Sequence, residues 1–270
     1  MTKRIGILYF SPTNTTKMTC NAIASGMGER DPQKLNMTLP DVRSKIATDP
    51  NTVTANVDHL VIGAPVYFGK LPAQFQECLR LIRGNGIECS AVVVYGNRDY
   101  GIALYQMVEV LSNNGFGVIA AGAFIGQHSY SDVVPVAIGR PDKSDIEKAY
   151  SFGVNSLSTS NYLSLENIPI QTDIFSKSNM YMPLKPVFIA KLCTQCGICA
   201  DYCPEGLLSS ATGMYPSRAA KKQCIGCMAC SFNCTHKARV AKPNVILKLA
   251  MNIILRRASI ERNEPITIFS

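Results

Sequence analysis

Eight of the eleven cysteines in this 270-residue chain crowd into one segment, and their spacing limits what that segment can fold into. Two runs of the form Cys-x2-Cys-x2-Cys-x3-Cys occur there, and the second is displaced from the first by 31 residues. One unit has therefore been duplicated. Crowding of this kind indicates metal ligation rather than a secreted disulfide framework. The eight positions are Cys193, Cys196, Cys199, Cys203, Cys224, Cys227, Cys230 and Cys234.

The three-step spacing is typical of iron-sulfur ligation. A tight loop presents three thiolates to a cube of four irons, and in the two-cluster arrangement the fourth cysteine of each run ligates the cluster of the other run. Zinc sites are the alternative, but zinc knuckles use paired Cys-x2-Cys arms, so the spacing favours two 4Fe-4S clusters. One cluster is expected on Cys193, Cys196, Cys199 and Cys234, and the other on Cys224, Cys227, Cys230 and Cys203.

The two runs, CTQCGICADYCP from Cys193 and CIGCMACSFNCT from Cys224, resemble those of the bacterial-type ferredoxins. The resemblance implies a small α+β two-cluster domain at residues 187–242. The second run ends in Thr235 where the first has Pro204, so the match is incomplete at that position. Because eight thiolates already supply both clusters, we expect the neighbouring His236 to be a surface imidazole rather than a ligand.

Residues 1–160 alternate short apolar runs with amphipathic stretches, a pattern typical of a parallel sheet with helices on both faces. Strands are expected at residues 4–10, 34–38, 59–63, 91–96 and 118–123. Helices are expected at residues 14–27, 72–83, 102–113 and 142–157. The sequence therefore predicts an α/β domain with five parallel strands.

A hydroxyl-rich turn, SPTNTT from Ser11, follows the first predicted strand and opens the first predicted helix. Helix amides and hydroxyl groups converge there, which predicts an anion site. The turn lacks the Gly-x4-Gly-Lys of nucleotide triphosphatases and suits a monophosphate such as that of FMN. A capped helix with incidental Ser and Thr residues is the alternative. The candidate phosphate ligands are Ser11, Thr13, Asn14, Thr15 and Thr16.

Two further loops follow the third and fourth predicted strands, at the carboxyl edge where open α/β sheets bind ligands. They carry glycines and aromatic residues, and we expect Tyr67, Phe68 and Tyr100 to flank an isoalloxazine ring. The candidate ring-binding residues are Pro65, Val66, Tyr67, Phe68, Gly69, Tyr95, Gly96, Asn97, Arg98, Asp99 and Tyr100.

Through these three loops, residues 1–160 resemble a flavodoxin, with Asn14 where that family usually has glycine. The resemblance implies a flavodoxin-like doubly wound parallel sheet of strand order 2-1-3-4-5 that binds FMN. The order of the two modules resembles the flavodoxin-ferredoxin fusion proteins of anaerobic microbes, which implies electron transfer with redox protein partners. The loose dinucleotide fingerprint GFGVIA at residues 115–120 opens a predicted strand instead of a helix, so a nicotinamide site is disfavoured.

Two segments fall outside the predicted domains. At residues 161–186 periodicity fades and Ser, Thr, Asn and Pro take over, which predicts a linker or an arm lying on a neighbouring surface. Residues 243–270 form a C-terminal helix and tail. A helix over residues 244–257 carries a single polar stripe on an apolar cylinder, so we expect it to be mostly covered. The stripe consists of Asn244, Lys248, Asn252 and Arg256.

The net charge of +8 lies in the C-terminal third, where residues 183–270 carry 12 Lys and Arg against 4 Asp and Glu. Such a basic segment is typical of nucleic-acid binding. However, eight thiolates and two cluster cores of about +2 each add about −4, which leaves an ordinary surface, so no nucleic-acid partner is expected. The most apolar stretch, at residues 245–255, is too short to span a bilayer. With no secretory leader visible, we expect a cytoplasmic protein, and a homodimer stays open.

Everything recognisable in the sequence is redox machinery, and no nucleophile-base pair accompanies it. The leading hypothesis is an electron-transfer protein that relays single electrons between the two clusters and FMN. The alternative is an oxidoreductase that reduces a small substrate at FMN, with Arg98, Asp99 and His128 as candidate substrate groups. A redox sensor is a third reading. The remaining cysteines, Cys20, Cys78 and Cys89, are expected to be buried core thiols.

Overall fold

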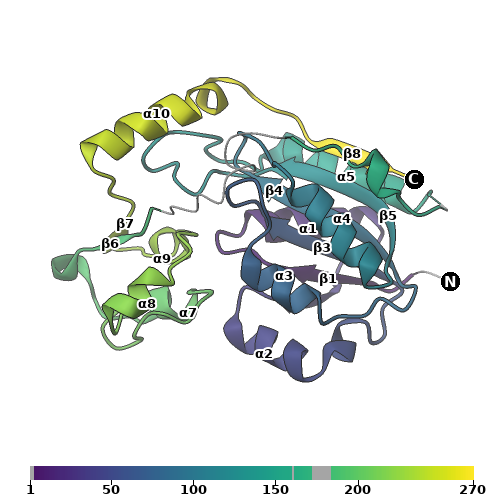
Figure 1. The fold of residues 1–270 in the computed structure, drawn as a ribbon, viewed down its shortest axis with the longest axis horizontal. Helices are drawn as coiled ribbons and strands as arrows, with labels where there is room; N and C mark the ends of the chain where they lie inside the picture. The colour runs from purple at the N-terminus through teal and green to yellow at the C-terminus, as the bar shows by residue number, and fades with distance from the viewer. Residues whose placement is uncertain (1–2, 160, 172–183) are drawn as a thin grey trace.

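The computed structural model describes residues 3–159, 161–171 and 184–270. Its larger part is an α/β structure in which helices cover both faces of one six-stranded sheet (Figure 1). The strand order is β2-β1-β3-β4-β5-β8. The strands are β1 (Ile5–Tyr9), β2 (Gln33–Asn36), β3 (His59–Pro65), β4 (Glu88–Tyr95), β5 (Gly117–Ile125) and β8 (Ile266–Phe269).

The first five strands pair in parallel, and their order 2-1-3-4-5 is the flavodoxin-like doubly wound order. This confirms the predicted fold class. Every residue of β1, β3 and β5 is buried, since helices cover the sheet on both sides. Strands buried on both faces are near-continuous apolar runs in the sequence, which is why β1, β3, β4 and β5 were predictable. The edge strand β2 is the exception, since its sequence QKLN is polar and partly exposed.

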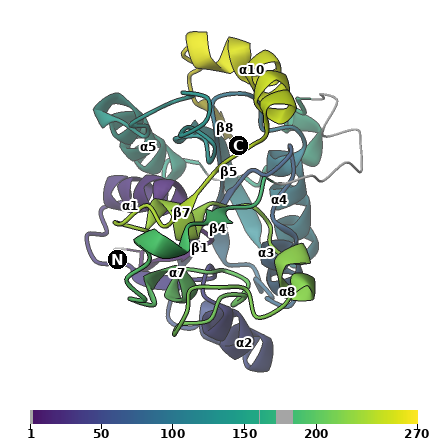
Figure 2. The ribbon, with the colours of Figure 1, turned by 90° about the vertical axis from the view of Figure 1, so that its left-hand side faces the viewer.

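Helices lie on the two faces of the sheet in two sets (Figure 2). On one face are α1 (Thr15–Gly26) and α5 (Lys143–Ser156), which cross so closely that a Cβ on Gly153 would lie 2.1 Å from the Ile23 carbonyl oxygen. The other face is covered by α2 (Pro40–Thr48), α3 (Ala73–Leu79) and α4 (Ala103–Asn113). Of these five, only α2 was not predicted. It buries a single residue, Ile46, so its sequence carries little periodic signal.

The sixth strand comes from the segment that was expected to be a tail. β8 pairs antiparallel with the edge strand β5, from Ala120 opposite Phe269 to Ala123 opposite Ile266. In Figure 1 the chain runs from α10 (Val245–Ile260) back across the molecule to this edge. A four-residue strand whose partner lies far away in the chain has no local signature, because its pairing decides its structure.

The expectation that the C-terminal helix is mostly covered is wrong within this chain. Only Met251, Leu255 and Ala258 of α10 are buried, in a small apolar cluster with Val134 and Val136. The opposite side is also apolar and lies open to solvent, with Val245 84% exposed. When nearly all sides of a helix are apolar, its sequence does not show which of them pack against the rest of the chain.

The cysteine-rich segment contains little regular structure. β6 (Val187–Phe188) and β7 (Arg239–Val240) form a two-stranded antiparallel sheet, with short helices α7 (Ile198–Asp201), α8 (Arg218–Lys222) and α9 (Ala229–Phe232) beside it. The sequence repeat is also a structural repeat. Both α7 and α9 begin within a cysteine run, after Gly197 at φ 77° and Met228 at φ 61°.

The predicted linker is described only in part, because residues 172–183 lie outside the described residues. Its first part packs on the α/β domain. Leu163 and Ile168 are buried in the main apolar core, on either side of a short 3-10 helix, η2 (Leu165–Asn167). A second 3-10 helix, η1 (Pro50–Val53), follows α2, and a third, η3 (Ala190–Leu192), precedes the first cysteine run. None of the helices in the described residues is long and apolar enough to cross a membrane.

Candidate cofactor sites

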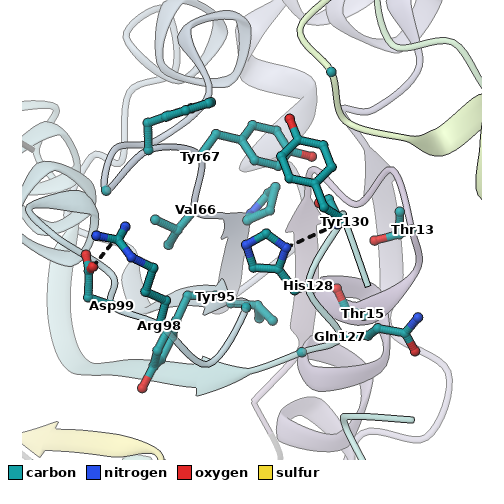
Figure 3. A pocket seen from close by; sticks show the side chains of 18 of the residues that line it. Thr13, Thr15, Val66, Tyr67, Tyr95, Arg98, Asp99, Gln127, His128 and Tyr130 are labelled. Carbon is teal, nitrogen blue, oxygen red and sulfur yellow. Dashed lines mark hydrogen bonds and ion pairs between the residues drawn. The ribbon is translucent and has the colours of Figure 1, made fainter. Parts of the chain in front are cut away.

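A pocket opens at the carboxyl edge of the sheet, where the three loops predicted to bind flavin meet (Figure 3). Eleven of the sixteen predicted residues line it, while Ser11, Asn14, Thr16, Asn97 and Tyr100 do not. One of the eleven, Pro65, is the last residue of β3. The predicted residues that line the pocket are Thr13, Thr15, Pro65, Val66, Tyr67, Phe68, Gly69, Tyr95, Gly96, Arg98 and Asp99.

The hydroxyl-rich turn forms the start of α1. The Ser11 hydroxyl accepts a hydrogen bond from the Lys17 amide at 3.0 Å, and Asn14 precedes the helix at φ 66° without a side-chain cap. Thr16 is 1% exposed, and its hydroxyl has no hydrogen-bond partner among the described residues. A buried unpaired hydroxyl costs about 1–3 kcal/mol. An orphaned hydroxyl at a helix start whose N-cap side chain makes no hydrogen bond fits an anionic ligand such as a phosphate.

The loops that follow β3 and β4 touch each other. Phe68 and Gly69 both have positive φ, 53° and 72°, which turns the first loop back on itself. In the second loop, a Cβ on Gly101 would lie 2.4 Å from the Gly69 carbonyl oxygen. A Cβ on Gly96 would lie equally close, 2.4 Å, to the ring of His128. Glycine at these positions therefore lets three stretches of backbone meet around one pocket.

Two predicted ring-binding side chains turn away from the pocket. Tyr100 is fully buried and packs edge-on against Tyr95, with ring centroids 5.6 Å apart. The Asn97 amide donates to the carbonyl oxygens of Ala258 and Glu261 at 2.8 and 2.6 Å. Its oxygen accepts from the Asn263 amide at 3.0 Å. Asn97 thus fastens the loop to the end of α10 instead of lining the pocket.

The loop that follows β5 supplies a fourth wall, which the sequence analysis missed except for His128. Gln127, Ser129 and Tyr130 also line the pocket. The Tyr130 amide donates to Nδ1 of His128 at 3.1 Å, and the two rings lie 5.6 Å apart. Burial, and secondarily Arg98, lowers the pKa of His128 to about 4, so the imidazole is neutral at pH 7. Applying the carboxyl-edge rule to the fifth predicted strand would have found this loop.

Four cysteines line a second cavity, and they come from both runs. Cys203 of the first run meets Cys224, Cys227 and Cys230 of the second. Burial raises the pKa of the Cys230 thiol to about 12 and raises that of Cys227 well above its ordinary value. Thiols with such raised pKa values become thiolates at neutral pH only when a metal replaces the proton. The Leu207 amide points at the sulfur of Cys203, 3.4 Å away.

The other four cysteines are more accessible to solvent. A Cβ on Gly213 would lie 3.3 Å from the Cys199 sulfur and 3.8 Å from that of Cys193. The Ala238 amide donates to the sulfur of Cys234 at 3.2 Å, and Cys196 is exposed. Across the residues that the structure describes, no three His, Cys, Asp or Glu side chains converge on one point as ligands of a single ion. A cube of four irons has no such requirement, because each thiolate binds its own iron.

The two cavities are neighbours. Ile225 and Gly226 lie between Cys224 and Cys227. Together with Tyr130, they line the pocket at the carboxyl edge of the sheet. A second connection comes from α2, where the Arg43 guanidinium donates to the carbonyl oxygens of Thr38 and Pro204. Pro204 directly follows Cys203, so Arg43 joins the start of α2 to the cysteine-rich segment. The other cysteines, Cys20, Cys78 and Cys89, are buried in the α/β core as predicted.

Comparison with known proteins gives a family for the cysteine-rich segment. Residues 185–235 match the 4Fe-4S dicluster domain family. No curated protein matches the sequence. The match covers both cysteine runs and gives the segment a redox role. The flavodoxin-like strand order and the dicluster match together fit a flavodoxin-ferredoxin fusion protein, which agrees with the resemblance noted in the sequence.

Several solved structures are similar to the α/β domain. A flavodoxin from the domain Archaea is 15% identical, covers 57% of this chain and 96% of its own, and has a TM-score of 0.42. Flavodoxin 1 from Bacillus cereus is 17% identical, with coverages of 57% and 97% and a TM-score of 0.42. An apo NADH:FMN oxidoreductase is 19% identical, with coverages of 59% and 91% and a TM-score of 0.42.

Proposed function

We propose that this chain is an electron-transfer protein that relays single electrons between two 4Fe-4S clusters and a bound FMN. The observation that carries the proposal is the position of Ile225 and Gly226. They belong to the loop between Cys224 and Cys227, and they also line the pocket formed by the predicted flavin loops. One stretch of backbone is therefore both a predicted cluster-binding loop and a wall of the predicted flavin site.

Crossed ligation is part of the proposal. Cys203 would complete the set of Cys224, Cys227 and Cys230, and its place in their cavity supports this assignment. Cys234 would complete the set of Cys193, Cys196 and Cys199. Bound clusters exchange one electron at a time, while bound FMN accepts one or two, so the combination connects one-electron and two-electron chemistry.

The residues of the α/β domain would hold FMN at both ends. The Thr16 hydroxyl and the N-terminus of α1 are suited to the phosphate. At the ring end, Tyr67 and Tyr95 supply aromatic surface and the loop glycines allow close approach of backbone amides. His128 presents a neutral imidazole there, because its pKa is about 4.

A substrate-reducing iron-sulfur flavoprotein is the second candidate, because Arg98, Asp99 and His128 all line the pocket. The same observations weaken it. The Arg98 guanidinium lies 3.2 Å from the Asp99 carboxylate, so the two side chains form an ion pair. The neutral His128 accepts a backbone hydrogen bond at Nδ1. Neither the paired Arg98 nor the neutral His128 is therefore suited to give up a proton to a substrate at pH 7.

Reduction of the flavin through the clusters tests the proposal. The intact protein, prepared anaerobically, is expected to hold about eight irons and eight acid-labile sulfides. Mixed with a one-electron donor, it should bleach its flavin absorbance at least tenfold faster than a Cys193→Ala, Cys224→Ala double variant. The Cys20→Ala variant, which removes a buried core thiol, is the matched control and should behave like the intact protein. Equal bleaching rates in the intact protein and the double variant would refute the relay.

The ligand assignment has its own test. Cys203→Ala should deplete the cluster of Cys224, Cys227 and Cys230, although Cys203 belongs to the other run. Iron analysis and electron paramagnetic resonance (EPR) of the reduced protein, compared with a Cys196→Ala variant, show which cluster is lost. Loss of the same cluster in both variants would contradict the crossed ligation.

A further inference from the structure

A fully buried arginine lies inside the cysteine-rich segment. Arg239, in β7, is 1% exposed. Its guanidinium carbon lies 5.2 Å from the ring centroid of Phe188 and 5.2 Å from that of Tyr215. Two aromatic rings thus hold the cation in place by cation-π contacts. Arginine is rarely fully buried unless its charge is paired.

The donors of this guanidinium are only partly used. Nη2 donates to the carbonyl oxygen of Gly213. Nε and Nη1 are both buried and have no hydrogen-bond partner, cysteine sulfur included, among the described residues. Leaving a charged donor unpaired in an interior costs more than the penalty of about 1–3 kcal/mol for a neutral group. The two nitrogens therefore point to an acceptor of a kind that the described residues do not supply.

The surroundings of Arg239 are the predicted cluster ligands. Tyr215, one of its two aromatic neighbours, lines the cavity of Cys203, Cys224, Cys227 and Cys230. The Ser231 hydroxyl donates to the Arg239 carbonyl oxygen at 2.9 Å, and Ser231 directly follows Cys230. On the side of the first run, the Gly213 carbonyl oxygen accepts from Arg239, and a Cβ on Gly213 would lie 3.3 Å from the Cys199 sulfur. Arg239 therefore contacts residues that lie beside both predicted sets of cluster ligands.

We propose that Arg239 sets the reduction potential of the neighbouring 4Fe-4S clusters by donating hydrogen bonds from its guanidinium to their sulfides. The inference rests on the proposed function, because it assumes that clusters are bound beside Arg239. Reduction adds one negative charge to a cluster. A fixed cation in a low-dielectric interior favours the reduced form, and hydrogen bonds to the sulfurs act in the same direction.

Substitution of Arg239 tests this assignment. Arg239→Met removes the charge and the donors, Arg239→Lys keeps the charge without the planar fork, and Arg218→Met is a matched control at an exposed cation of the same segment. EPR-monitored redox titration of the full-length protein gives the potential of each cluster, and a Cys196→Ala variant assigns the signals. Arg239→Met should make reduction of at least one of the two clusters tenfold or more less favourable, about 59 mV for one electron. Arg239→Lys should shift the potential less, and Arg218→Met should not shift it.

A measurement on the unmutated chain covers the case in which a variant fails to fold. Protein grown on arginine labelled with ¹⁵N in the guanidinium alone should show a ¹⁵N hyperfine coupling to the reduced cluster in pulsed EPR. Absence of that coupling, or an unchanged potential in Arg239→Met protein with full iron content, would overturn the inference alone. Protein that takes up no iron at these cysteines would overturn the proposed function and this inference together.

Discussion

The α/β domain and the cysteine-rich segment differ in what holds them together. In the first, β1, β3 and β5 are buried along their whole length between two apolar clusters. In the second, residues 187–242 are all described, yet they supply none of the buried side chains of the three apolar clusters, and their strands are two residues long. Burial of apolar surface stabilises the first region, while the second needs cross-links.

Removal of iron should therefore have the largest effect, and it should affect the cysteine-rich segment far more than the α/β domain. We expect anaerobic chelation to unfold residues 187–242, because the proposed iron-thiolate bonds would take the place of a large apolar core there. Hydrogen exchange read by mass spectrometry should show these amides unprotected in the iron-free protein, while β3, β4 and β5 keep their protection. Unchanged protection of residues 187–242 would mean that this segment folds without clusters.

A substitution in the α/β core should have the opposite effect: it should destabilise the α/β domain and leave the clusters in place. Phe152 is 1% exposed and packs on Phe124 and Phe269, with ring centroids 5.4 and 5.3 Å apart. Phe152→Ala should lower the free energy of unfolding by about 3–5 kcal/mol. Urea titration measures the loss, and the visible absorbance of the clusters should persist in the folded variant. The control is Phe232→Ala in the cysteine-rich segment, where a 52% exposed ring should contribute within about 0.5 kcal/mol.

Loss of the Thr16 hydroxyl tests the anion site of the α/β domain. A hydrogen bond to a charged phosphate contributes about 1.5–3 kcal/mol, so Thr16→Ala should weaken FMN binding about ten- to hundred-fold. Flavin fluorescence titration of the apoprotein gives the dissociation constant. Thr19→Ala is the matched control, since the Thr19 hydroxyl donates to the Thr15 carbonyl oxygen inside α1. Equal affinities of both variants for FMN would place the phosphate elsewhere.

The smallest expected effect concerns His128. Its pKa of about 4 in the folded protein is below the ordinary value of about 6.5, so the unfolded state takes up a proton first as the pH falls. Stability should decrease between pH 6.5 and 4, by at most about 1.4 kcal/mol per pH unit from this residue. His128→Gln should lack that component, while His59 is common to both proteins. Parallel urea unfolding profiles from pH 6.5 to 4.5 would contradict a neutral imidazole at His128 in the folded protein.

The structure of the two regions could be predicted from the sequence to different extents. Apolar runs predicted the buried strands β1, β3, β4 and β5, and cysteine spacing predicted the two cluster-binding runs, since each signal lies within a few residues. β8 and the exposure of α10 were missed because distant partners decide them. In the pocket, the carboxyl-edge rule found the loops of Thr13, Tyr67 and Arg98. It did not foresee that Asn97 is bonded to the end of α10, because that contact joins segments far apart in the sequence.

The contact between the two regions is the central claim, and intramolecular electron transfer tests it most directly. After rapid photoreduction by a one-electron donor, the rate constant for flavin reduction in the intact chain should stay the same over a tenfold range of protein concentration. Ile225 and Gly226 already form part of the pocket wall, so no second molecule is needed. A rate constant that rises in proportion to protein concentration would contradict the account, because the electrons would then pass between molecules.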